Sequence, residues 1–251
     1  MCSMTDPYQV IHNRDPFKQR MLQKCARSVR RKVLTAIRDR SSLNVRILTR
    51  SPLAREDFDL MKSFGDRLLL GTSLPTLDQT IANLYEPKAP APKQKLKLLL
   101  DAHAAGIPTY VAVAPVYPEV GYQGILEVFE AVKEAAPHTI FMEPVNLRLG
   151  VAERINAEAT KLDRKIDMSP YLDSEVWAKY AIRTLHDAER AAEAAGFSDR
   201  LHLWPDHDAL GSKHVVKTQP NPEAYVRWLE GWWKRISEWP GRQQSSHPST
   251  P

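Results

Sequence analysis

The sequence predicts an α/β fold: a parallel sheet covered by helices, forming a partial (β/α) barrel with a helical C-terminal extension. Short, nearly continuous apolar runs alternate with segments of helical periodicity, and prolines or glycines stand at the ends of most runs. Strands of parallel sheets are buried on both faces and need crossover helices, so this alternation indicates βαβ units. With 251 residues, 43% of them hydrophobic, the chain is long enough for one large core.

The first predicted element is a helix over residues 17–40. A β-rich run at 44–49 follows, and Ser51 is a candidate N-cap, with Pro52 at the first position of a helix that continues to Phe64. Helical spacing predicts one buried apolar stripe on the first helix, with Cys25 as a packed thiol on it. The stripe consists of Leu22, Cys25, Val29, Val33 and Ile37.

The same alternation continues to Asn146 and then becomes mainly helical. The tryptophans of the last predicted helix have the spacing of residues that pack against a core. We expect a barrel over residues 1–150, a helical extension over 151–239 and a disordered polar tail over 240–251. The predicted strands are 67–73, 108–114, 139–143 and 201–204, and the predicted helices are 93–105, 124–136, 151–162, 174–195 and 222–239.

The net charge of +5 is concentrated in residues 18–40, where nine cations face one acid, Asp39. Such a segment is typical either of a surface that follows phosphates, with Arg27, Arg30 and Arg31 as the nucleic-acid candidates, or of a solvated helix face. No apolar run approaches the roughly 20 residues that cross a bilayer, so no membrane partner is expected. Two unpatterned cysteines favour a reducing cytoplasm.

Polar residues follow the predicted strands at their carboxyl ends, the face that carries the working site in parallel β/α barrels. Hydroxyls, carboxylates, an amide and one arginine suit a polar ligand with hydroxyl, amine and carboxylate groups. The strand-end segments are residues 5–9, 49–51, 72–76, 114–118, 143–146 and 205–208.

A second group of candidates lies near the predicted strand at 201–204. Histidines and carboxylates at this density are able to hold a divalent metal. However, the run lacks a helical pair such as HExxH, so a loop that lines the pocket is the favoured interpretation, with Asp206, His207 and Asp208 as weak metal candidates. The full group is His202, Asp206, His207, Asp208 and His214.

Four segments carry a resemblance to a known family. The series TDPYQ, ILTRSPLAREDFDLM, LLLGTSLPT and LYEPKAPAPKQKLKLLLDAHAAGIPTYVAVAPVYP, from about Thr5 to Asn146, resembles the radical S-adenosylmethionine superfamily, and within it the spore photoproduct lyase-like group. The resemblance implies a partial (β/α)6 barrel with two cofactors. A [4Fe–4S] cluster is bound by CxxxCxxC after the first strand, and S-adenosylmethionine is cleaved to a radical that abstracts hydrogen.

The resemblance also implies roles for the strand-end candidates. Arg50 stands where a lysine often follows a threonine, here Thr49, and would meet the carboxylate of S-adenosylmethionine; arginine keeps the charge with a wider fork. Ser73 would lie near the methionine or ribose. The remaining candidates would surround cofactor and substrate, although a loop hydroxyl or carboxylate often caps a helix instead. They are Asp6, Tyr8 and Gln9 after the second strand and Glu143 and Asn146 after the sixth.

The cluster motif is absent, because Cys2 and Cys25 do not make a three-thiolate site. We therefore expect the C-terminal portion of a radical enzyme that lacks the first strand and cluster loop, binds no cluster and is inactive alone. Three explanations stay open: a truncated start, a start assigned at an internal methionine, or a partner chain that supplies the cysteines. The exposed sheet edge would need something to cover it. The alternatives are a non-catalytic nucleic-acid or nucleotide-binding protein on a degraded barrel, and a metal-dependent hydrolase built on residues 206–208.

Overall fold

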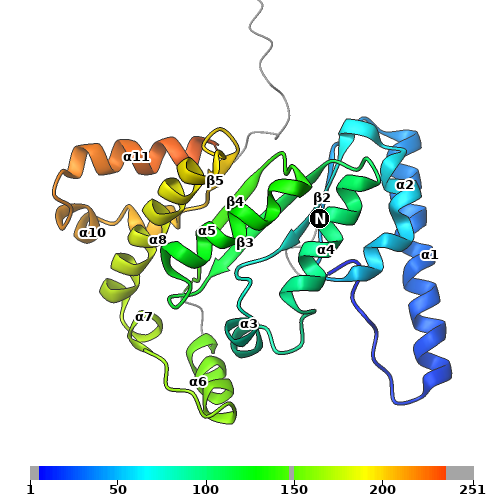
Figure 1. Cartoon of the computed structure of the whole chain (residues 1–251), viewed down its shortest axis with the longest axis horizontal. Helices are drawn as coiled ribbons and strands as arrows, with labels where there is room; N and C mark the ends of the chain where they lie inside the picture. The colour runs from blue at the N-terminus through cyan, green and yellow to red at the C-terminus, as the bar shows by residue number, and fades with distance from the viewer. Residues whose placement is uncertain (1–5, 147–149, 236–251) are drawn as a thin grey trace, which may run out of the picture.

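Five parallel strands form the sheet in the computed structural model, which describes residues 6–146 and 150–235 (Figure 1). Their order in space equals their order in sequence, so every crossover leads to the adjacent strand, as in the wall of a β/α barrel. The predicted parallel sheet is confirmed. The strands are β1 Val45–Leu48, β2 Leu68–Ser73, β3 Thr109–Val116, β4 Ile140–Pro144 and β5 Leu201–Leu203.

Most of the predicted helices are observed within a few residues of their expected ends. The helix Gln79–Tyr85 was not predicted, and the segment after Ser51 divides into a 3-10 helix, Pro52–Asp57, and a short α-helix. Residues 236–239, with Trp239, and the predicted tail at 240–251 lie outside the described residues. The α-helices are α1 Pro16–Arg40, α2 Phe58–Lys62, α3 Gln79–Tyr85, α4 Pro92–Ala104, α5 Gly121–Val132, α6 Val151–Lys161, α7 Ser169–Leu172, α8 Ser174–Ala195, α9 His207–Leu210, α10 Lys213–Lys217 and α11 Pro222–Arg235.

Two apolar clusters bury the helix-covered face of the sheet. The larger one packs α5 and α8 against β3 and β4, and the smaller one packs α2 and α4 against β1 and β2. The alanine-rich face of α8, including Ala181 and Ala188, is fully buried against α5, because small side chains let the two helices approach closely. Since β5 pairs with β4, the predicted C-terminal extension also contributes a strand to the sheet.

The opposite face of the sheet carries a separate aromatic cluster around Tyr110 and Phe141. Their rings meet edge to face at 5.8 Å, a favourable arrangement for two aromatic side chains. Tyr110 lies over Gly71 on the neighbouring strand, and a Cβ at Gly71 would stand 2.5 Å from ring atoms of Tyr110. The glycine is therefore needed for the close approach of the ring to the backbone.

The predicted buried stripe of α1 is wrong except at its C-terminal end, where Ile37 packs against the smaller apolar cluster. Val29 is 55% exposed and Leu22 is 46% exposed, whereas Leu34, which lies on the opposite side of the helix, is 2% exposed. Cys25 is also exposed and not a packed thiol. The physical reason is that α1 docks through ion pairs and cation–π contact as well as apolar packing, so hydrophobic spacing alone indicated the wrong face.

Candidate functional site

A turn at the carboxyl end of β1 is held by one carboxylate. Asp6 accepts hydrogen bonds from the backbone N–H of Tyr8 at 2.8 Å, from the Thr49 hydroxyl at 2.7 Å and from the backbone N–H of Arg50 at 2.8 Å. Thr49 is 1% exposed and in turn accepts from the N–H of Ser51. Asp6 and Thr49 therefore fix the backbone conformation from which the Arg50 side chain projects.

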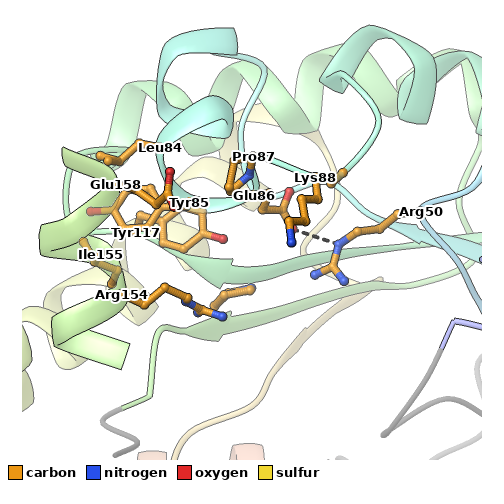
Figure 2. A pocket seen from close by; sticks show the side chains of 12 residues that line it. Arg50, Leu84, Tyr85, Glu86, Pro87, Lys88, Tyr117, Arg154, Ile155 and Glu158 are labelled. Atoms are coloured by element: carbon orange, nitrogen blue, oxygen red, sulfur yellow. Dashed lines mark ion pairs between the residues drawn. The ribbon is translucent and has the colours of Figure 1, made fainter. Parts of the chain in front are cut away.

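The Arg50 side chain is held from its Nε side by a buried ionic group. Arg50 Nε lies 2.8 Å from Glu86 Oε1, and Lys95 Nζ lies 2.6 Å from Glu86 Oε2. Burial lowers the pKa of Lys95, and the charge of Glu86 acts against that shift. Both Glu86 oxygens are engaged, and the terminal nitrogens of Arg50, which lines the neighbouring cavity, point away from Glu86 (Figure 2).

That cavity has a volume of about 480 Å³, within the range of small-molecule sites. Three cations on its wall, Arg50, Lys88 and Arg154, outweigh two acids, and one of these acids, Glu86, is shared with buried Lys95. Lys88 and Arg154 form no ion pair among the described residues, so the cavity favours an anionic group. It is lined by Arg50, Leu84, Tyr85, Glu86, Pro87, Lys88, Ala89, Pro115, Tyr117, Arg154, Ile155 and Glu158.

Two stacked tyrosines form a rigid wall of the cavity. The rings of Tyr85 and Tyr117 are 3.7 Å apart and nearly parallel, and the Tyr85 hydroxyl donates to Glu119 and shares a hydrogen bond with Tyr171. Burial raises the pKa of both Tyr85 and Tyr117, so both remain neutral phenols. Tyr117 belongs to a predicted strand-end segment, but no sequence pattern indicated that Tyr85 stacks on it.

Three other predicted ligand contacts do not line this cavity. Ser73 is 2% exposed and donates its hydroxyl to the carbonyl of Ala114 at 2.8 Å. Tyr8 is fully buried beneath the Arg30 guanidinium, 4.0 Å from the ring centre. Gln9 is exposed, and its carbonyl accepts a hydrogen bond from the Gln23 amide. The side chains of Ser73 and Tyr8 therefore serve local hydrogen bonding and packing.

The last two strand-end candidates lie together after β4. Asn146 donates its side-chain amide to Glu143 at 2.6 Å, and neither residue lines the cavity. The sequence pattern correctly placed both at the end of a strand. In the structure, however, Glu143 and Asn146 do not line the cavity beside Arg50.

The weak metal candidates are engaged locally. Asp206 accepts from the N–H of Ala209 as the N-cap of α9, His207 lies 5.3 Å from the Trp233 ring centre, and Asp208 is within 3.8 Å of His207. Within residues 6–146 and 150–235 the structure brings no three histidine, cysteine or carboxylate groups into a metal-binding cluster.

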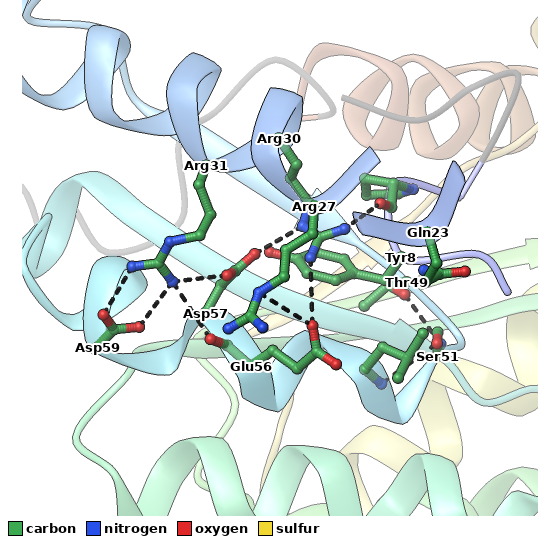
Figure 3. A network of polar contacts seen from close by, with 12 residues as sticks. Tyr8, Gln23, Arg27, Arg30, Arg31, Thr49, Ser51, Glu56, Asp57 and Asp59 are labelled. Atoms are coloured by element: carbon green, nitrogen blue, oxygen red, sulfur yellow. Dashed lines mark hydrogen bonds and ion pairs between the residues drawn. The ribbon is translucent and has the colours of Figure 1, made fainter. Parts of the chain in front are cut away.

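The arginines predicted to contact nucleic acid instead dock α1 onto the 3-10 helix and α2 (Figure 3). Arg30 and Arg31 both pair with fully buried Asp57, at 2.7 and 2.8 Å, and Arg31 also pairs with an acid of α2, Asp59. Arg27 lies 3.4 Å from Glu56. These three arginines are therefore paired with acids within the fold, and nucleic-acid contact through them stays a prediction.

Structural comparison decides the fold. Three spore photoproduct lyase structures superpose with TM-scores of 0.53–0.54 at 14–16% identity, covering 72% of this chain and 56% of theirs. The chain has the fold of spore photoproduct lyase. One of these structures is a double mutant with bound AdoMet and dinucleoside spore photoproduct, and another is complexed with the dinucleoside photoproduct.

Sequence comparison adds a viral relative. An uncharacterized protein, ORF301 of Acidianus two-tailed virus, is 29% identical over 146 residues, covering 55% of this chain and 48% of the relative. This chain thus spans about half the length of the curated relative it matches. No protein-family model matches the chain. Among the described residues, no helix is long and apolar enough to cross a membrane.

The residues present fit one of the two groups that the resemblance implies. A [4Fe–4S] cluster of this type needs three thiolates, but the sequence has two cysteines. Cys2 lies outside the described residues, and Cys25 is exposed on α1. The cluster therefore does not fit this chain. The carboxylate of S-adenosylmethionine does fit, because Arg50, paired with Glu86, offers a guanidinium at the edge of a cavity whose cations outnumber its acids.

Proposed function

We propose that this chain binds S-adenosylmethionine through Arg50 and forms the C-terminal portion of a radical enzyme of the spore photoproduct lyase type. The observation that carries the proposal is the Arg50–Glu86–Lys95 group beside the cavity, on a fold shared with spore photoproduct lyase. Bound S-adenosylmethionine supplies the hydrogen-abstracting chemistry in the family that the sequence resembles. The residues of this chain bind and orient the ligand.

Arg50 suits this role because Glu86 contacts its Nε and leaves its two terminal nitrogens available to a ligand. Glu86 holds Nε, while the side chain as a whole is 42% exposed. A carboxylate approaching the terminal nitrogens would complete a charge-assisted, two-point contact. The stacked rings of Tyr85 and Tyr117 form an apolar wall beside the ligand. The hydrogen bonds that Asp6 accepts hold the backbone at Arg50 in place.

This chain has too few cysteines to hold the cluster, and we infer that a partner chain in the cytoplasm supplies the iron ligands. The isolated chain is then inactive and stays colourless after anaerobic treatment with iron and sulfide. A stable brown [4Fe–4S] species on this chain alone would contradict that part of the proposal.

Equilibrium dialysis with labelled S-adenosylmethionine tests the ligand site. A charge-assisted hydrogen bond contributes about 1.5–3 kcal/mol, so Arg50→Met should weaken binding by roughly ten- to a hundredfold, and Arg50→Lys should recover part of the loss. Arg55→Met is the matched control, because Arg55 pairs with Asp101 and does not line the cavity. Equal binding by wild type and Arg50→Met would refute the assignment.

A non-catalytic nucleotide-binding protein is the second candidate, favoured by Lys88 and Arg154 on the cavity wall without ion pairs among the described residues. This function predicts that adenosine monophosphate binds more tightly than adenosine and that Lys88→Met removes the preference. Competition between the nucleotide and S-adenosylmethionine separates the two candidates. Nucleotide binding that is tighter than S-adenosylmethionine binding and unchanged in Arg50→Met would favour the nucleotide-binding function.

A further inference from the structure

Helix α1 exposes a continuous apolar ridge to solvent. Phe17 is 63% exposed, Met21 56%, Val29 55% and Val33 38%. Exposed Cys25 fills the remaining position, so a cysteine or large apolar side chain occurs at every fourth residue from 17 to 33. Leu22, 46% exposed, widens the ridge. Isolated apolar side chains on a surface need no explanation, whereas a contiguous patch marks an interaction site.

The geometry of the ridge is that of a helix-packing surface. Side chains spaced by four residues form the inclined rows that interdigitate when two helices cross at about −50°. At 25 residues, α1 extends about 37 Å and lies at the outer edge of the fold (Figure 1). Its other side is already occupied by Leu34 and by the ion pairs to Asp57. The ridge is therefore available to a helix that crosses α1 from outside.

The charges around the ridge specify the chemistry of that helix. Between residues 17 and 38 the helix contains no aspartate or glutamate. Lys18, Lys24 and Lys32 are exposed and form no ion pair with any residue that the structure describes. Lys18 and Lys32 lie three or four residues from members of the ridge and so share its face.

We propose that the ridge of α1, Phe17 to Val33, docks an acidic amphipathic helix of a partner protein. A second copy of this chain would oppose its own lysines and arginines across the contact. An anionic lipid surface would also attract Lys18 and Lys32, but it does not require the regular four-residue spacing of the ridge, which a crossing helix does. A nucleic-acid duplex would leave the large apolar side chains against phosphates. An acidic helix with its own apolar row satisfies both the ridge and the cations.

The test uses the full chain and a synthetic helical peptide with a row of leucines flanked by glutamates. Fluorescence anisotropy should show binding that weakens at least about tenfold in Met21→Ser/Val29→Ser. Lys18→Gln/Lys32→Gln should weaken binding and make it less sensitive to added salt, because two of the cations that attract the glutamates are then neutral. Alkylation of Cys25, followed by mass spectrometry at that peptide, should slow when the acidic peptide is bound, because Cys25 lies in the ridge.

The matched control is Leu172→Ser, which removes a 72% exposed leucine from α7. Circular dichroism and thermal melting confirm that each variant is folded. Binding equal in the ridge variant and the control, or no protection of Cys25, would overturn the proposal. So would ridge-dependent dimers of the chain, or ridge-dependent binding to anionic vesicles or duplex DNA in preference to the peptide.

Discussion

Replacing Glu86 by glutamine tests the ionic group that orients Arg50. The Glu86 side chain is 7% exposed and that of Lys95 is 1% exposed, so the substitution leaves an ammonium group buried without its counter-charge. Breaking a buried pair from one side costs about 3–5 kcal/mol. The contact with Arg50 adds at most about 1 kcal/mol, because the Arg50 side chain is 42% exposed and screened by water.

We therefore expect Glu86→Gln to lower the free energy of unfolding by about 3–5 kcal/mol in urea titrations at neutral pH. For a chain of this size the corresponding decrease in Tm is roughly 6–20 °C. Lys95→Met in the same background should restore most of the loss, since the buried charge is then removed. The four proteins form a double-mutant cycle that isolates the Glu86–Lys95 coupling.

The pH dependence gives an independent check with a defined sign. Burial lowers the pKa of Lys95 from 10.5, and Glu86 opposes this shift, so the pKa of Lys95 should fall further in Glu86→Gln. Between the lowered folded-state pKa and 10.5 the unfolded chain binds more protons, and stability rises with pH. The deficit of Glu86→Gln should thus shrink from pH 7 toward pH 10. The reasoning would be refuted if the loss of unfolding free energy in Glu86→Gln did not change with pH, or if it were equally large in the Lys95→Met background.

Three further substitutions probe other parts of the structure. Gly71→Ala should cost about 1–3 kcal/mol in urea unfolding, because its Cβ would meet the Tyr110 ring at 2.5 Å, and the cost should diminish in Tyr110→Leu. Asp57→Asn should destabilise the chain by about 3 kcal/mol or more, since Arg30, with a side chain 8% exposed, loses its counter-charge; Asp208→Asn, an exposed acid, is the control. Asp6→Ala should weaken S-adenosylmethionine binding, because the turn that carries Arg50 loses its hydrogen bonds. Affinity equal to that of wild type would contradict this role of Asp6.

The sequence predicted the sheet well because buried parallel strands leave a local signature. The runs that became β2 and β3 are apolar and end at polar or proline-marked turns, and α8 ends at Gly196, whose positive φ is typical of a glycine after a helix. The burial of α1 could not be predicted in this way. Its inward side uses Arg30 paired with Asp57, a contact between residues 27 positions apart.

The candidate site was predicted in part. Arg50 was found from its place after a strand, and it does reach a cavity. Glu86 and Lys95 were not identified, because neither follows a strand, and a lysine on a helix is normally solvated. The stacking of Tyr85 on Tyr117 depends on the packing of α3 beside β3, which no local pattern encodes. Ser73 and Tyr8 lie at strand ends as predicted. However, the Ser73 hydroxyl donates to a backbone carbonyl, and the Tyr8 side chain is buried in the core.

The central claim is that Arg50 recognises the carboxylate of S-adenosylmethionine, and a comparison with decarboxylated S-adenosylmethionine tests it most directly. Calorimetric titration of wild type and Arg50→Met with both ligands gives a cycle in which only the carboxylate and the guanidinium change. We predict that wild type prefers S-adenosylmethionine by about tenfold or more and that Arg50→Met shows no preference. Equal affinity of wild type for the two ligands, or a preference that survives in Arg50→Met, would contradict the account.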